Sequence, residues 1–208
     1  ADLAADLRAE VKNGVNKASI TVKNEETEEG GYVYIGGISA NSAISAQKAS
    51  FAPALNMVQN TGAISFDGAG LDVRLGGVAA MTSVSGFASS GDTVNDGSLS
   101  VSGNIKKRLY VGGIFASDEF DKKNVRTGSY INNGAITSEL ADTLTVVGGY
   151  AGYLVKNDIR TFADGEVTAP FKLVKNTGAI TVSGGDKEPG ISAVGIGGLV
   201  GWSQFNVL

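Results

Sequence analysis

The chain has 208 residues, among them 30 glycines and 3 prolines, and 18% of its residues are charged. This composition indicates a globular protein and excludes collagen-like or proline-rich disordered chains, which need a glycine triplet or a proline excess. The formal net charge of −4 argues against a nucleic-acid partner, because phosphate contacts need a basic surface. Without histidine, Ser-His-Asp and Cys-His catalysis is excluded, and so is nearly every zinc site. We therefore expect no cofactor.

Residues 1–15 differ in pattern from the rest of the chain. Leu3, Leu7 and Val11 are four residues apart, which is the spacing of an apolar helical stripe. We expect either a short helical cap, which would protect the edge of the first repeat, or a processed terminus. The repeats described next are expected to occupy residues 16–208.

Two short phrases recur in the same order five times from residue 16 onward. The first begins with Asn and reads NTGAISF at 60–66 and NTGAITV at 176–182; the second contains two glycines, as in VGGIFA at 111–116. Asparagines 35 to 44 residues apart are typical of a repeat protein. The repeated residues are Asn16, Asn60, Asn95, Asn132 and Asn176, with the glycine pairs Gly36 and Gly37, Gly76 and Gly77, Gly112 and Gly113, Gly148 and Gly149, and Gly197 and Gly198.

The residues after each asparagine alternate between aliphatic and hydroxylated side chains. Asn and Gly tolerate left-handed backbone angles, so the phrase is expected to form a sharp bend before a strand. Period-two alternation then places the aliphatic column inside and the hydroxyl column outside. The aliphatic column is Ile20, Ile64, Leu99, Ile136 and Ile180, and the hydroxyl column is Thr21, Ser65, Ser100, Thr137 and Thr181.

The glycine pairs predict a second bend in each repeat. Val111 and Ile114 flank one pair and would point to opposite faces of a flat strand, whereas a bend at the glycines lets both point inward. Short strands joined by bends, with matching residue types at matching positions, predict an all-β parallel β-helix (β-solenoid). We expect about five rungs of three strands, starting near residues 16, 60, 95, 132 and 176. A propeller and a β-sandwich are the alternatives.

The paired phrases resemble the GLUG-type repeats of large bacterial surface proteins. VGGYAGYL at 147–154 and IGGLVGW at 196–202 carry the resemblance, while Ala40, Ala80 and Ala116 depart from the final glycine of the pattern. The resemblance implies a β-helical segment of a secreted or surface-anchored bacterial protein, found in adhesin-like proteins. It implies no catalytic residues.

Three groups of side chains are candidates for chemistry. An enzyme that cleaves polysaccharides would need acidic and basic residues clustered on one face, and Asp72, Arg74, Lys106, Lys107 and Arg108 occupy comparable positions in adjacent repeats. Asp118, Glu119 and Asp121 could supply oxygens to calcium, although their spacing is not that of a calcium loop. Tyr32, Tyr34, Tyr110 and Tyr150 lie near the glycine pairs, where they would either stack on sugar rings or fill the solenoid wall.

We expect the chain to be a non-enzymatic structural or adhesion segment, located extracellularly or at a bacterial cell surface. Recognition of a protein or glycan on a host or neighbouring cell is expected in the segments that do not repeat, chiefly 23–33, 40–55, 117–130 and 156–170. The alternatives are a self-assembling fibre subunit, which would pair end to end through exposed strands, and a polysaccharide-degrading enzyme. The most apolar run, residues 193–202, is too short to span a membrane as a helix.

Overall fold

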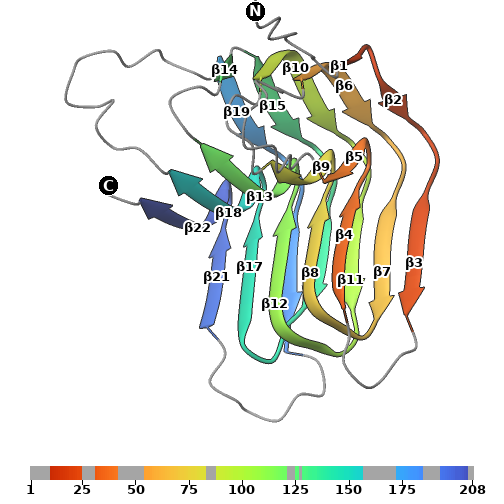
Figure 1. Ribbon diagram of the computed structural model, residues 1–208, viewed down its shortest axis with the longest axis vertical. Coiled ribbons are helices and arrows are strands. Elements are labelled where there is room, and N and C mark those ends of the chain that lie inside the picture. The colour runs from red at the N-terminus through yellow and green to blue at the C-terminus, as the bar shows by residue number, and fades with distance from the viewer. Residues whose placement is uncertain are drawn as a thin grey trace, which may run out of the picture.

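The computed structural model describes residues 10–24, 31–41, 54–82, 88–120, 125–126, 128–156, 172–184 and 193–205. All regular secondary structure in these ranges is β-strand, and every strand pair is parallel. Strands from successive repeats lie side by side along the axis of the solenoid (Figure 1). The predicted all-β parallel solenoid is therefore confirmed. The cap expected in residues 1–15 lies largely outside the described residues, and Glu10–Lys12 is a strand paired with Ala54–Asn56.

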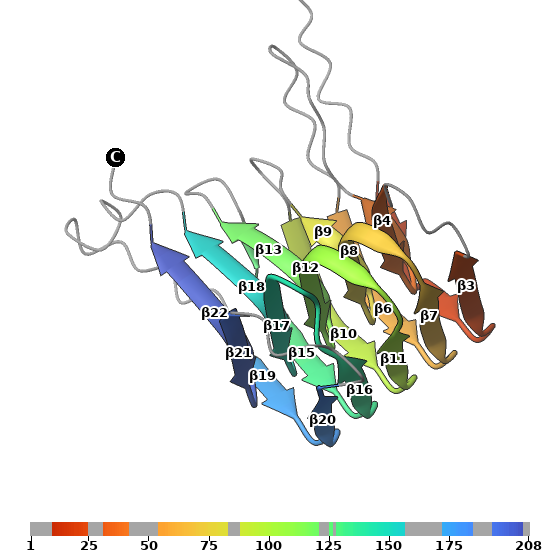
Figure 2. The same ribbon diagram turned by 90° about the horizontal axis from the view of Figure 1, so that it is seen from below.

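Each turn of the solenoid passes through four sheets in a fixed order (Figure 2). Sheet A precedes the asparagine and sheet B follows it, whereas sheets C and D precede and follow the glycine pair. Sheet A contains β1 (Glu10–Lys12), β2 (Val15–Asn16), β6 (Ala54–Asn60), β10 (Ala88–Asn95), β14 (Val125–Arg126), β15 (Ser129–Asn132) and β19 (Leu173–Asn176). Sheet B contains β3 (Ile20–Asn24), β7 (Ile64–Gly68), β11 (Leu99–Ser102), β16 (Ile136–Glu139) and β20 (Ile180–Ser183).

Sheets C and D complete the turn. Sheet C contains β4 (Tyr32–Gly36), β8 (Gly70–Gly76), β12 (Ile105–Gly112), β17 (Leu144–Gly148) and β21 (Ala193–Gly197). Sheet D contains β5 (Ser39–Asn41), β9 (Ala79–Thr82), β13 (Phe115–Phe120), β18 (Ala151–Lys156) and β22 (Val200–Phe205).

The number of strands in a turn corrects the expectation from the sequence. The sequence pattern predicts three strands, because a bulge at the glycine pair can bend a strand without ending it. The bend at that pair instead ends sheet C and begins sheet D, which gives four strands in each turn. A propeller is excluded by the parallel pairing, since its blades are antiparallel.

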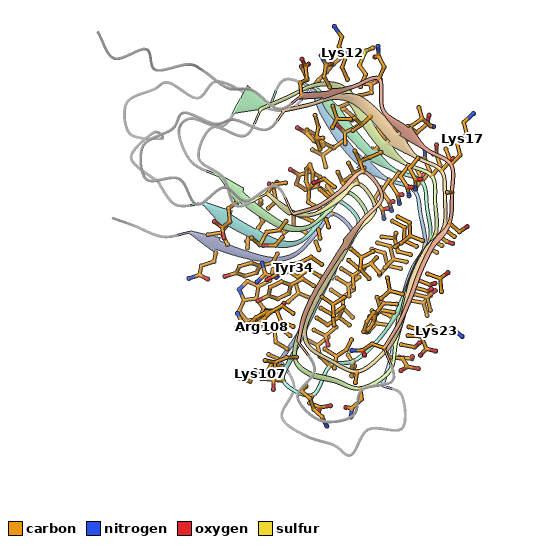
Figure 3. The ribbon with its side chains drawn as sticks, turned by 45° about the vertical axis from the view of Figure 1, so that its right-hand side comes forward. Lys12, Lys17, Lys23, Tyr34, Lys107 and Arg108 are labelled. Atoms are coloured by element: carbon orange, nitrogen blue, oxygen red, sulfur yellow. The ribbon has the colours of Figure 1, made fainter. Side chains whose placement is uncertain are left out.

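The cross-section of the solenoid is bent into two core lobes (Figure 3). Sheets B and C enclose the first lobe, whose fully buried side chains include Ile64, Phe66 and Leu109. Sheets A and D enclose the second lobe, where Phe115, Tyr130 and Tyr150 pack edge-on or tilted with ring centroids 5.3–5.8 Å apart. Burying a large apolar side chain contributes about 1.5–3 kcal/mol, so these inward columns hold the turns together.

The five repeated asparagines form a hydrogen-bonded ladder at the bend between sheets A and B. Each Nδ2 of the first four donates to the Oδ1 of the asparagine in the next turn, at 2.7–2.8 Å. Each of the five Nδ2 atoms also donates to the carbonyl two residues later, at 2.9–3.0 Å. Asn60, Asn95 and Asn132 are 0% exposed. One side chain therefore closes the bend and joins neighbouring turns.

The expected bend is present, but left-handed backbone does not make it. Among the described residues, positive φ angles belong to Asn13, Met57, Gly68, Gly91 and Gly103, none of which is in the Asn-x-Gly phrases. Glycine is needed there because the turns stack closely. A Cβ on Gly97 would lie 2.0 Å from the carbonyl oxygen of Gly62, and a Cβ on Gly134 would lie 2.0 Å from that of Gly97.

The glycine pairs meet the asparagine ladder between the two lobes. The first glycine allows the tight bend, because a Cβ on Gly112 would lie 1.7 Å from the oxygen of Phe115 in the same turn. The second glycine makes room for the ladder, because a Cβ on Gly113 would lie 2.4 Å from Cγ of Asn132 in the next turn. The asparagine phrase of one turn therefore packs against the glycine pair of the turn before it. Val111 and Ile114 both point inward, as expected, but into different lobes.

Candidate functional site

The outer face of sheet C carries a cluster of aromatic and charged side chains from successive turns. Strand register places Tyr34, Arg74 and Tyr110 side by side in one row, and Tyr32, Asp72 and Arg108 in the next. Tyr34, Arg108 and Lys107 project from this face, with Tyr34 the nearest of the three to sheet D and Lys107 near the start of β12, whereas Lys23 projects from the opposite side of the molecule (Figure 3). We call Tyr34, Asp72, Arg74, Arg108, Tyr110 and Tyr153 the outer cluster.

Arg74 is held between two aromatic rings at the centre of the outer cluster. Its guanidinium carbon lies 5.5 Å from the ring centroid of Tyr34 and 5.1 Å from that of Tyr110. Its Nη1 donates to the sulfur of Met81 on β9, at 3.0 Å. Cation–π contacts of this kind contribute roughly 0.5–2 kcal/mol, depending on how far the pair is removed from water. Arg74 therefore orders both tyrosines and joins sheet C to sheet D.

Asp72 fixes the two arginines of the cluster. Its carboxylate is 1% exposed and lies 3.1 Å from Nε of Arg74 and 3.4 Å from Nε of Arg108. A buried carboxylate needs such partners because burial disfavours its charge. Burial also opposes the charge on Arg108, but the Tyr110 hydroxyl and the Asp72 carboxylate outweigh it and raise the pKa of Arg108.

Tyr153 adds a stacked ring from sheet D. Its ring lies 5.1 Å from that of Tyr110 at an interplanar angle of 12°, and its hydroxyl donates to Oε1 of Gln204 on β22. Burial, together with the neighbouring Tyr110, raises the pKa of Tyr153, so its phenol stays a neutral hydrogen-bond donor. Tyr153 is not among the site residues predicted from the sequence. The signal was the mixed composition of its column, which also holds Met81, Ser117 and Trp202 and so indicates an outward position.

The structure separates Tyr150 from the other candidate tyrosines. Tyr150 follows directly on a glycine pair and points into the second core lobe, where its hydroxyl donates to Asp118. The alternative that tyrosines fill the solenoid wall therefore holds for Tyr150. Tyr34 and Tyr110 belong to the outer cluster, and Tyr32 is 64% exposed beside it.

The acidic run at 117–123 does not form a calcium site in the described residues. Asp118 is fully buried and accepts hydrogen bonds from the hydroxyls of Thr82 and Tyr150, whereas the next residue, Glu119, is half-buried. Adjacent residues of a strand point to opposite faces, so the two carboxylates do not converge. Asp121 lies outside the described residues. No group of three or more acidic side chains in the described ranges is placed to hold a metal ion.

We expect Glu119→Gln to raise the melting temperature at neutral pH. Burial raises the pKa of Glu119; Arg74 partly opposes the shift and Asp118 adds to it. The folded chain therefore holds this proton more tightly than the unfolded chain, and stability falls as pH rises through the window between the ordinary pKa of 4.5 and the raised value. Glutamine removes that loss. Thermal unfolding from pH 7 down to below 4.5 should show the gain shrinking to nothing; a gain independent of pH would contradict this account.

Of the acidic and basic residues predicted as candidates for catalysis, only some lie close together. Asp72, Arg74 and Arg108 lie together, whereas Lys106 Nζ pairs with Asp142 at 3.5 Å.

Much of the variable sequence, namely 25–30, 42–53, 121–124, 127 and 157–170, lies outside the described residues. No helix in the described ranges is long and apolar enough to cross a membrane. No family model, curated protein or solved structure matches the chain.

Proposed function

We propose that the chain is a non-enzymatic structural and adhesion segment of a secreted or surface-anchored bacterial protein. Its repeated phrases build a rod, and its non-repeating surface recognises a protein or glycan on a host or neighbouring cell. The resemblance to GLUG-type repeats supports the compartment.

The burial of the repeated residues is the observation that carries this proposal. Three of the five ladder asparagines are inaccessible to solvent, and the second glycines pack against the ladder. These residues cannot reach a ligand. The outward row that contains the exposed Tyr32 and Arg108 continues with Leu144 and Ala193, so the accessible surface changes its chemistry from turn to turn. Variation on the surface over a constant interior suits recognition better than a repeated catalytic unit.

The test is to measure retention and turnover on the same set of surfaces. The purified chain is incubated with immobilised polysaccharides and with intact cells, and both bound protein and newly formed reducing ends are measured. We expect retention on at least one surface without new reducing ends. Cleavage that is lost in Asp72→Asn would instead identify an enzyme. Absence of retention on every surface would refute adhesion.

A second candidate function, self-assembly through an edge of the stacked sheets, is favoured by the turn that β19 to β22 form. Its inward positions Val194, Ile196 and Leu199 are 43%, 53% and 42% exposed, although the same columns are buried one turn earlier. Strands β19 to β22 also form one edge of the four sheets, and open edges pair with other strands. Light scattering over a range of concentrations tests this candidate. Mass that grows with concentration, and falls in Ile196→Lys, is expected of a fibre subunit; a constant monomer mass would exclude it.

A further inference from the structure

We propose that the outer cluster, together with exposed Tyr32 and Trp202, binds a linear acidic polysaccharide by pairing Arg108 with a uronate carboxylate. The inference rests on the proposed role in recognition and names the ligand class and the site. Its elements are a held cation, a second exposed cation beside it and exposed aromatic rings.

Arg108 is the cation that is placed to meet a ligand. Arg74 is occupied, because its Nε and Nη2 face Asp72 and its Nη1 donates to Met81. Arg108 shares the same carboxylate through Nε, but its side chain is 45% exposed. A guanidinium held from one side presents its remaining N–H groups in a fixed direction, which suits a planar carboxylate. Asp72 and Arg74 therefore act as positioning residues for Arg108.

The exposed aromatic residues are distributed along the solenoid axis. Tyr32 lies two turns before Arg108 in the same row, which is about 10 Å at the usual spacing between strands. On sheet D, Trp202 is paired in register with Tyr153, whose ring stacks on Tyr110. Trp202 is 44% exposed. Amphipathic rings spaced over several turns, with a cation between them, fit an extended polymer that lies along the axis rather than a small compact ligand.

Charge selects an acidic sugar polymer over the other candidates. Lys107 and Arg108 are consecutive exposed cations that project from this face (Figure 3), whereas Lys106 pairs with Asp142 between sheets B and C. A neutral sugar would leave these cations unused. A nucleic acid needs many phosphate contacts over a broad basic surface, which a chain of net charge −4 does not provide. A polymer of carboxylated sugars offers one charge per unit and a ring face that stacks on tyrosine or tryptophan.

The experiment compares one oligosaccharide with and without its charge. Oligogalacturonate and its methyl ester share the same rings and linkages, so calorimetric titration of the full chain with each isolates the carboxylate. We expect the acid to bind at least tenfold more tightly than the ester. Arg108→Gln should weaken binding of the acid at least tenfold and leave the ester unchanged, whereas Tyr32→Ala should weaken both. Lys23→Gln, which removes a cation from the opposite side, should change neither.

The three altered side chains, Tyr32, Arg108 and Lys23, are exposed, so the variants are expected to fold like the parent chain, which circular dichroism verifies. Equal binding of acid and ester, or equal losses in Arg108→Gln and Lys23→Gln, would overturn the proposal. So would failure of the acid to bind, and tighter binding to a single-stranded oligonucleotide of equal charge. If the acid fails to bind but the chain is still retained on cells or on other polysaccharides, this inference fails and the proposed function stands.

Discussion

Gly113→Ala should lower the free energy of unfolding by about 3 kcal/mol or more, because the added methyl group has no room. Its Cβ would lie 2.1 Å from the oxygen of Gly149 and 2.4 Å from Cγ of Asn132. Neither atom can move freely, since one is backbone and the other belongs to the asparagine ladder. Denaturation in urea measures the loss.

Gly198 provides the matched control for this prediction. It occupies the same position in the last turn, where a Cβ would meet nothing within 4 Å. Gly198→Ala should therefore change stability by less than about 0.5 kcal/mol. Equal losses in the two variants would mean that the glycines serve the backbone conformation itself and not the contact with the next turn.

Asn95→Ala should be the second severe substitution, costing about 3 kcal/mol or more. The change removes two hydrogen bonds that Nδ2 donates, to Gly97 and Asn132, and one that Oδ1 accepts from Asn60. Three buried polar groups lose a partner, at about 1–3 kcal/mol each, because no water reaches the site. Chemical denaturation of the variant and the parent chain measures the difference.

Asn176→Ala is the control at the end of the ladder. Asn176 is partly exposed, accepts one bond from Asn132 and donates one to Gly178. Water can satisfy the groups left behind, so its loss should be about 1–2 kcal/mol. A cost for Asn95→Ala no larger than that for Asn176→Ala would contradict the ladder as a cooperative support.

The columns of the solenoid were predictable from the sequence because similar residue types recur at the same position of each repeat. Positions such as Ile64, Leu99 and Ile136 keep one residue type in each turn, and stacking requires this of an inward position. The direction of Tyr150 was equally readable. Ile38, Val78, Ile114 and Leu199 occupy its position in the other turns, and a column that is otherwise aliphatic points inward.

The contact between the two repeated phrases was not predictable in the same way. Asn132 and Gly113 lie in different turns and in different parts of the repeat, so their meeting depends on how the whole turn closes. The same holds for the outer cluster. Asp72 and Arg108 could be matched by repeat position, but Tyr153 reaches Tyr110 only because sheets C and D meet at an angle at the glycine pair. The angle between sheets C and D cannot be predicted from the local sequence.

Hydrogen–deuterium exchange of the asparagine side-chain amides, followed by NMR, tests the central claim most directly. The claim is that the repeated phrases are interior and that recognition belongs to the surface around them. The Nδ2 protons of Asn60, Asn95 and Asn132 should exchange only as fast as the chain unfolds, whereas those of partly exposed Asn56 and exposed Asn133 should exchange rapidly. If Asn60, Asn95 and Asn132 exchange as rapidly as Asn56 and Asn133, the repeated asparagines lie on the surface, within reach of a ligand, and the account is contradicted.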